Sequence, residues 1–175
     1  MHSRSKSKLS VRQLVIFALL GALMFTSKWV TEFLPNVHLL GVFTVAFTVH
    51  YRKKALYPIS VFVLLMGLFT GFSNWWIPYL YLWFLLWGAV MLVPKGLSAR
   101  TRLILYIVIC SLHGFLYGTL YAPAHAIIMN LDFKQTLAWI SVGFPWDVVH
   151  GVSNAVVGAL LIRPIVKILK RIDKN

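Results

Sequence analysis

A chain of 175 residues, of which 59% are hydrophobic and only 12% charged, is too apolar to be a water-soluble domain. The mean hydropathy of +0.79 indicates an integral membrane protein, and the length allows about six spans of roughly 20 residues with short loops. The net charge of +13 would suit a nucleic-acid partner, but the cations are scattered over loops and tails, so we expect none. The single Cys110 excludes an internal disulfide and a cysteine-based zinc site.

Apolar runs separated by turn and basic residues predict an all-α integral membrane protein with six transmembrane helices in one domain, residues 1–175. In chain order the spans are expected at about 11–33, 37–50, 56–72, 76–93, 103–123 and 145–169. The first run follows a basic segment, but it is long and lacks a clear small-residue cleavage pattern, so we expect an uncleaved span. Residues 135–142 could add a short interfacial helix before the last span.

The lysines and arginines are distributed very unevenly between the two sides of this topology. Of the 17, fifteen fall on one side, in residues 4–12, 52–54, 95–102 and 163–174, whereas only Lys28 and Lys134 fall on the other. Short loops rich in lysine and arginine stay in the cytoplasm. We therefore expect both termini to be cytoplasmic and the number of spans to be even.

Residues 143–154, Gly-Phe-Pro-Trp-Asp-Val-Val-His-Gly-Val-Ser-Asn, open the last predicted span. Pro145 suits the first position of a helix, and the helix dipole would stabilise Asp147 in the first turn. Asp147, His150 and Asn154 follow at i, i+3 and i+7 and share one helical face. Polar groups inside a bilayer are costly and usually face a cavity or a partner, so this stripe predicts a pocket wall. A network of hydrogen bonds between helices is the alternative.

Other aromatic and polar residues fall at the same outer level of the predicted bundle. They are Trp29 at the end of the first span, Trp75, Trp76, Tyr79 and Trp83 after the third loop, His113 and Tyr117 in a four-residue repeat that reaches Tyr121, and Trp146 beside the stripe. Together they predict an outward-facing, aromatic-lined binding pocket. The alternative for the tryptophans is the interfacial belt common to membrane proteins.

Motifs for catalysis and energy coupling do not occur in the chain. It has no Walker motif, no Gly-x-Ser-x-Gly, no His-Glu-x-x-His and only 4 acidic residues, so we expect no metal, no cofactor and no enzymatic activity. An ion-coupled carrier is disfavoured, because carriers usually need inverted repeats with buried charge. A membrane enzyme using Asp147 and His150 as an acid–base pair remains a third possibility.

Small residues on the first span and several longer strings carry a family resemblance. They are Ala-Leu-Leu-Gly-Ala at 18–22, Phe-Leu-Pro-Asn-Val-His at 33–38, Tyr-Arg-Lys-Lys-Ala-Leu-Tyr-Pro at 51–58, Asn-Trp-Trp-Ile-Pro-Tyr at 74–79, His-Gly-Phe-Leu-Tyr-Gly-Thr-Leu-Tyr-Ala-Pro at 113–123, and Pro-Trp-Asp-Val-Val-His-Gly-Val-Ser-Asn at 145–154. Over essentially its whole length, the chain resembles the substrate-binding S components of energy-coupling factor (ECF) vitamin transporters.

The resemblance implies a prokaryotic plasma-membrane protein that captures a vitamin from outside. Such a protein docks through Ala18 and Ala22 on a transmembrane coupling subunit, and two cytoplasmic ATPase subunits bind the ATP. The resemblance places the ligand among the outer aromatic residues and the stripe. It favours cobalamin or a related corrinoid; a smaller ring compound, of the pyridoxine, pyrimidine or queuosine-precursor type, is the alternative. A stand-alone receptor for a tetrapyrrole is a further alternative that would need no partner.

Overall fold

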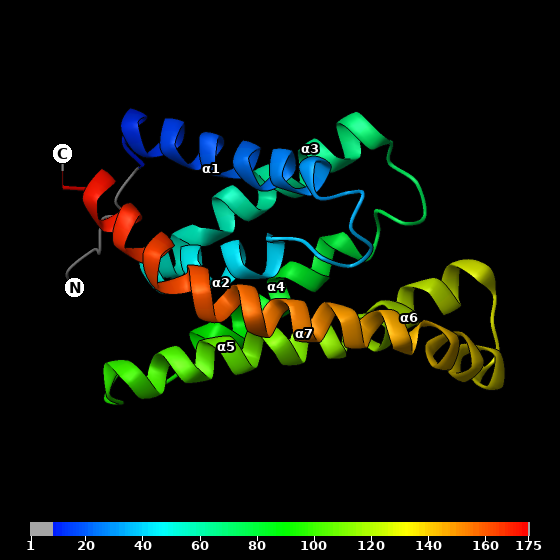
Figure 1. The fold of residues 1–175 in the computed structure, drawn as a ribbon. Helices are drawn as coiled ribbons and strands as arrows, with labels where there is room; N and C mark the ends of the chain where they lie inside the picture. The colour runs from blue at the N-terminus through cyan, green and yellow to red at the C-terminus, as the bar shows by residue number, and fades with distance from the viewer. Residues whose placement is uncertain (1–8, 175) are drawn as a thin grey trace, which may run out of the picture.

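The computed structural model describes residues 9–174, and within that range every regular element is a helix (Figure 1). The elements are α1 (Val11–Val30), α2 (Leu40–Tyr51), the short 3-10 helix η1 (Arg52–Ala55), α3 (Leu56–Thr70), α4 (Tyr79–Met91), α5 (Ala99–Phe115), α6 (Tyr117–Met129) and α7 (Phe133–Ile172). Arg4, Lys6 and Lys8, which contribute to the predicted cytoplasmic charge, lie outside the described residues.

Three helical stretches are long and apolar enough to cross a bilayer: Val11–Val30, Leu40–Thr70 and Phe133–Ile172. The second stretch includes α2, η1 and α3, and the bent pair of α5 and α6 brings the number to as many as four. The 13 residues of α4 are fewer than a span normally needs. The prediction of an all-α chain with membrane-spanning helices is confirmed at this level; six spans and cytoplasmic termini stay predictions.

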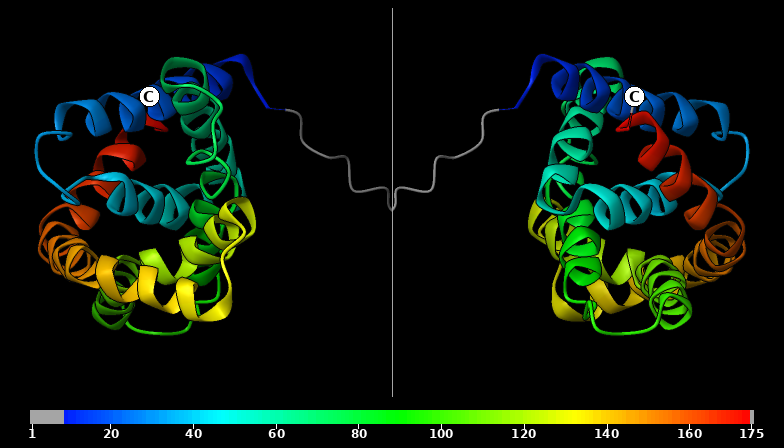
Figure 2. Two further views of the ribbon diagram at one scale, coloured as in Figure 1. Left: turned by 90° about the vertical axis from the view of Figure 1, so that its right-hand side faces the viewer. Right: turned by 90° about the vertical axis from the view of Figure 1, so that its left-hand side faces the viewer.

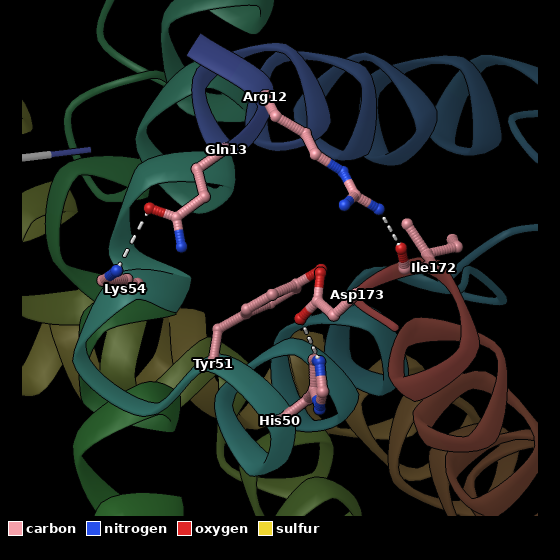
Figure 3. Close-up of polar contacts among 7 residues, drawn as sticks. All are labelled: Arg12, Gln13, His50, Tyr51, Lys54, Ile172 and Asp173. Atoms are coloured by element: carbon pink, nitrogen blue, oxygen red, sulfur yellow. Dashed lines mark hydrogen bonds and ion pairs between the residues drawn. The ribbon is translucent and has the colours of Figure 1, made fainter. Parts of the chain in front are cut away.

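The start of α1, the turn after α2 and the end of α7 meet at one end of the bundle, which we call the basic end (Figure 3). The Arg12 guanidinium donates a hydrogen bond to the carbonyl of Ile172. Asp173 accepts from the Tyr51 hydroxyl at 3.3 Å and pairs with His50 Nε2 at 2.7 Å. The Lys54 ammonium donates to Gln13 Oε1 at 3.2 Å. These contacts join segments far apart in sequence, so both described termini lie at this end (Figure 1).

The most enclosed helix is α2, which the other helices surround (Figure 2). Every residue from Leu40 to Thr48 is buried, as expected for a helix that is apolar on all sides. On one side α1 packs against α3 so closely that a Cβ on Gly21 would lie 2.5 Å from Val61 Cγ1. Because the buried side of α1 faces α3, its other side remains exposed.

The helix that carries the last predicted span does not begin at Pro145. Pro145 lies inside α7, which begins at Phe133 and is capped by Asp132. The Gln135 N–H donates to Asp132 Oδ1 at 2.7 Å, and the Asp132 N–H donates to Gln135 Oε1 at 2.9 Å. This reciprocal pair is a capping box, a stronger start signal than a proline. The expected interfacial helix at 135–142 is therefore the first part of α7.

The predicted span at 103–123 is not one straight helix. It is divided at Leu116 into α5 and α6, whose axes differ by 41°. The break lies between His113 and Tyr117, so it changes the direction of the four-residue repeat identified in the sequence. It also leaves the first N–H groups of α6 in need of partners.

Candidate ligand-binding site

Asp147 provides a partner for the start of α6. The N–H of Gly118, the second residue of α6, donates to both carboxylate oxygens of Asp147 at 3.0 Å. The approach requires glycine, since a Cβ at this position would lie 2.5 Å from Asp147 Oδ2. A carboxylate at a helix N-terminus is also favoured by the helix dipole. Asp147 therefore caps a neighbouring helix, and the expectation that it stands in the first turn of its own helix is wrong.

Asn154 joins α7 to α5. Its Nδ2 donates to the carbonyl of Cys110 at 3.1 Å, and the Ser111 hydroxyl donates back to the carbonyl of Gly151 at 2.9 Å. The two helices touch through glycine, because a Cβ on Gly114 would lie 2.8 Å from the Cα of Gly151. Of the predicted polar stripe, Asp147 and Asn154 thus hold helices together.

His150, the third member of the stripe, belongs to a group of buried and half-buried rings that we call the histidine–aromatic cluster. Its members are His38, Trp83, His113, Tyr117 and His150, contributed by the segment before α2 and by α4, α5, α6 and α7. Ring centroids lie 4.5 Å apart for His38 and His150, 5.0 Å for Tyr117 and His150, and 5.8 Å for Trp83 and His113. The cluster therefore brings together rings from five segments of the chain.

Several ring nitrogens of this cluster are enclosed yet make no hydrogen bond to any residue in the described range 9–174. They are Nδ1 of His38, Nε1 of Trp83, Nδ1 of His113 and Nε2 of His150. The other nitrogen of His113 lies 3.1 Å from the carbonyl of Leu82 and must donate to it, which leaves Nδ1 as an acceptor. A buried polar group without a partner costs about 1–3 kcal/mol, so a polar group that reached these nitrogens would stabilise the cluster.

A cleft of about 420 Å³, the outer cleft, opens between the segment before α4 and α6. Its lining residues are Ser73, Asn74, Trp75, Tyr121, His125 and Met129. The Tyr121 hydroxyl donates to the carbonyl of Trp75 at 3.2 Å and connects the two walls. The His125 ring also stacks on Trp139 of α7, with centroids 4.5 Å apart.

Aromatic contacts connect the outer cleft with the histidine–aromatic cluster. Trp75 contacts Tyr79 at 5.5 Å between centroids, and Tyr79 contacts Trp83 at 5.7 Å. Tyr121 contacts Tyr117 at 6.2 Å. Two lines of rings therefore lead from the cleft to the unpartnered nitrogens, and we take cleft and cluster together as the candidate site.

Seven of the eleven predicted substrate-binding residues have thereby been placed in or beside this site: Trp75, Tyr79, Trp83, His113, Tyr117, Asp147 and His150. Trp76 donates from Nε1 to the carbonyl of Val63 at 2.8 Å and so fastens its segment to α3. Trp29 and Trp146 are 52% and 53% exposed on the outside of the bundle, as tryptophans that meet lipid would be. The structure thus brings Trp29 and Trp146 into neither the cleft nor the cluster.

Sequence reasoning missed His38 and the cleft residues Ser73, Asn74, His125 and Met129. His125 continues the repeat of His113, Tyr117 and Tyr121 by one further step of four residues, a signal present in the sequence. His38 gave no periodic signal, because it precedes α2 and reaches the cluster only through the packing of α2 on α7. In residues 9–174 no three His, Cys, Asp or Glu side chains are arranged to hold a metal ion.

The comparisons with known proteins yield no match: no family model, no curated protein and no solved structure is significantly similar to the chain. The interpretation of the site therefore depends on its residues and geometry.

Replacing Asp147 by alanine is expected to lower the free energy of unfolding by about 0.5–2 kcal/mol, the usual loss on removing a helix cap. Asp147→Asn keeps one acceptor for the Gly118 N–H and should lose less. Thermal unfolding of both variants in one detergent measures the difference. Wild-type stability of Asp147→Ala would show that the cap contributes nothing.

Proposed function

We propose that the chain is the substrate-binding S component of an ECF-type vitamin transporter. In this proposal it crosses the prokaryotic plasma membrane six times, with both termini in the cytoplasm. The main support is the candidate site itself: ring contacts connect an aromatic cleft with buried ring nitrogens that have no partner among the described residues. The segments that line the cleft, residues 73–75 and α6, lie at the end of the bundle opposite the basic end (Figure 1), which is where a protein that captures a ligand from outside would bind it.

The size of the outer cleft favours a small substrate. Its volume of about 420 Å³ is at the lower end of the roughly 300–1,000 Å³ typical of ligand sites. A corrinoid, with its macrocycle and nucleotide side chain, would require the cleft to open considerably. A compound of one or two rings, of the pyridoxine, pyrimidine or queuosine-precursor type, would stack on Trp75 and Tyr121.

The exposed side of α1 supports a docking role. Ala18 is exposed and Ala22 half-buried, whereas Phe17 and Gly21 of the same helix are buried. Small residues four apart let another helix approach closely. The proposed partner at this surface is the transmembrane coupling subunit, which works with two cytoplasmic ATPase subunits. Uptake should therefore cease when ATP is depleted, although this chain has no nucleotide-binding motif.

The first test is native mass spectrometry of the detergent-purified protein produced in its own host. A bound ring compound would support the proposal and identify the substrate, and a bound corrinoid would show that the cleft opens. Copurification of an ATPase complex is the second test. An empty protein that copurifies with no ATPase and binds neither cobalamin nor pyridoxine would contradict the proposal.

Trp75→Ala is expected to weaken binding of the identified substrate about tenfold or more, because one stacking wall of the outer cleft is lost. Trp146→Ala is the matched control, since Trp146 is exposed outside the site. Titration calorimetry measures both affinities. If both variants lost the same affinity for the substrate, the ligand would bind outside the outer cleft.

A further inference from the structure

A second and larger cleft, of about 870 Å³, opens at the basic end between α5 and α7. The two helices are packed together near Gly114 and Gly151 and diverge towards this end (Figures 1 and 2). The turn after α2 and the segment after α4 close the other sides, through Arg52 and Lys95. We call this space the basic cleft.

Lysines and arginines dominate the polar lining of the basic cleft, and within residues 9–174 no acidic residue lines it. Two of its guanidinium groups already bind backbone carbonyls: Arg52 donates to Met91 at 3.2 Å and Arg102 to Lys95 at 2.9 Å. Their charges remain uncompensated, because a carbonyl is neutral. Like charges around one cleft repel each other, so a bound anion would stabilise this arrangement.

The remaining lining is apolar. Val49, Tyr106, Ile162 and Val166 form the deeper wall, from α2, α5 and α7. An inorganic anion would make no favourable contact with such a wall. A phospholipid would, because it has hydrocarbon chains as well as a phosphate. The cleft also lies at the ends of helices that are apolar enough to span a bilayer, at the level where phosphates are expected.

We propose that the basic cleft binds an anionic phospholipid, with its phosphate among the cations of α5 and α7 and its acyl chains against the apolar wall. Basic pockets between helices on the cytoplasmic side are suited to such headgroups. Seven lysines and arginines line the cleft, more than one phosphate can neutralise. A lipid with two phosphates, cardiolipin, should therefore bind more tightly than phosphatidylglycerol. The vitamin ligand is not required, because the outer cleft lies at the opposite end.

The experiment compares lipid binding by delipidated full-length protein in native mass spectrometry, titrated with cardiolipin, phosphatidylglycerol or phosphatidylcholine. The test variant replaces three exposed cations of the cleft by glutamine: Arg100, Lys167 and Lys170. The control variant replaces Lys53, Arg171 and Lys174, which are exposed, have the same total charge and do not line the cleft. Three lost cations should weaken cardiolipin binding roughly 100-fold in the test variant, while the control stays near wild type.

Three results would overturn the proposal. Equal weakening in both variants would show a general attraction of the basic surface. Equal binding of cardiolipin and phosphatidylcholine would show that the cations do not select the headgroup. Inorganic pyrophosphate binding as tightly as cardiolipin would identify a site for a soluble phosphate. Thermal unfolding of both variants verifies that the protein remains folded.

Discussion

Tryptophan at both Ala18 and Ala22 is expected to abolish substrate uptake and to leave substrate binding unchanged. Ala18 is exposed and Ala22 is half-buried, whereas the buried Gly21 faces α3, so the larger rings should project mainly away from the bundle. They would hold a partner helix too far away for close packing. Substrate uptake is measured in cells that express the complete transporter, and substrate binding is measured by titration of the purified variant.

The matched control replaces Leu64 and Leu68 of α3 by tryptophan. These residues are also four apart and exposed, at 51% and 60%, but on another helix. Their replacement should leave uptake intact. Unchanged uptake in the Ala18/Ala22 variant would reject the docking surface. If that variant kept its full function in cells that lack the partner subunits, the chain would instead be the stand-alone tetrapyrrole receptor.

Gly114→Ala is expected to destabilise the bundle by about 1–3 kcal/mol, the usual cost of overpacking a tight contact. The added Cβ would lie 2.8 Å from the backbone of Gly151 and 2.9 Å from Asn154 Nδ2. Backbone atoms cannot rotate away as a side chain can, so α5 and α7 would have to separate. The bond from Asn154 to Cys110 would lengthen with them.

Gly88→Ala in α4 is the control, because a Cβ there meets no atom within 4 Å. Alanine is the better helix former by about 0.5–1 kcal/mol, so this variant should be slightly more stable than the wild type. Thermal unfolding in the same detergent measures both changes. If Gly114→Ala were as stable as Gly88→Ala, α5 and α7 would not be in close contact at this point.

The polar stripe shows how far a sequence pattern can define a site. The spacing of Asp147, His150 and Asn154 predicted a shared helical face, and all three are buried. The pattern could not predict that each has a different partner. Asp147 meets Gly118 only because α5 and α6 are divided at Leu116. Gly114 and Gly118 flank that division, but single glycines also occur inside helices, so they do not by themselves predict it.

The sequence by itself determined that the chain is helical and apolar enough for a membrane, because backbone groups in a bilayer must be satisfied within helices. The sequence also contains helix-capping residues: Asp132 with Gln135 marks the start of α7 more strongly than Pro145 does. The assembly of His38, Trp83 and His150 into one cluster was decided only by the tertiary structure. The physical reason is that helix periodicity relates residues a few positions apart, whereas contacts between distant segments follow from close packing of their side chains.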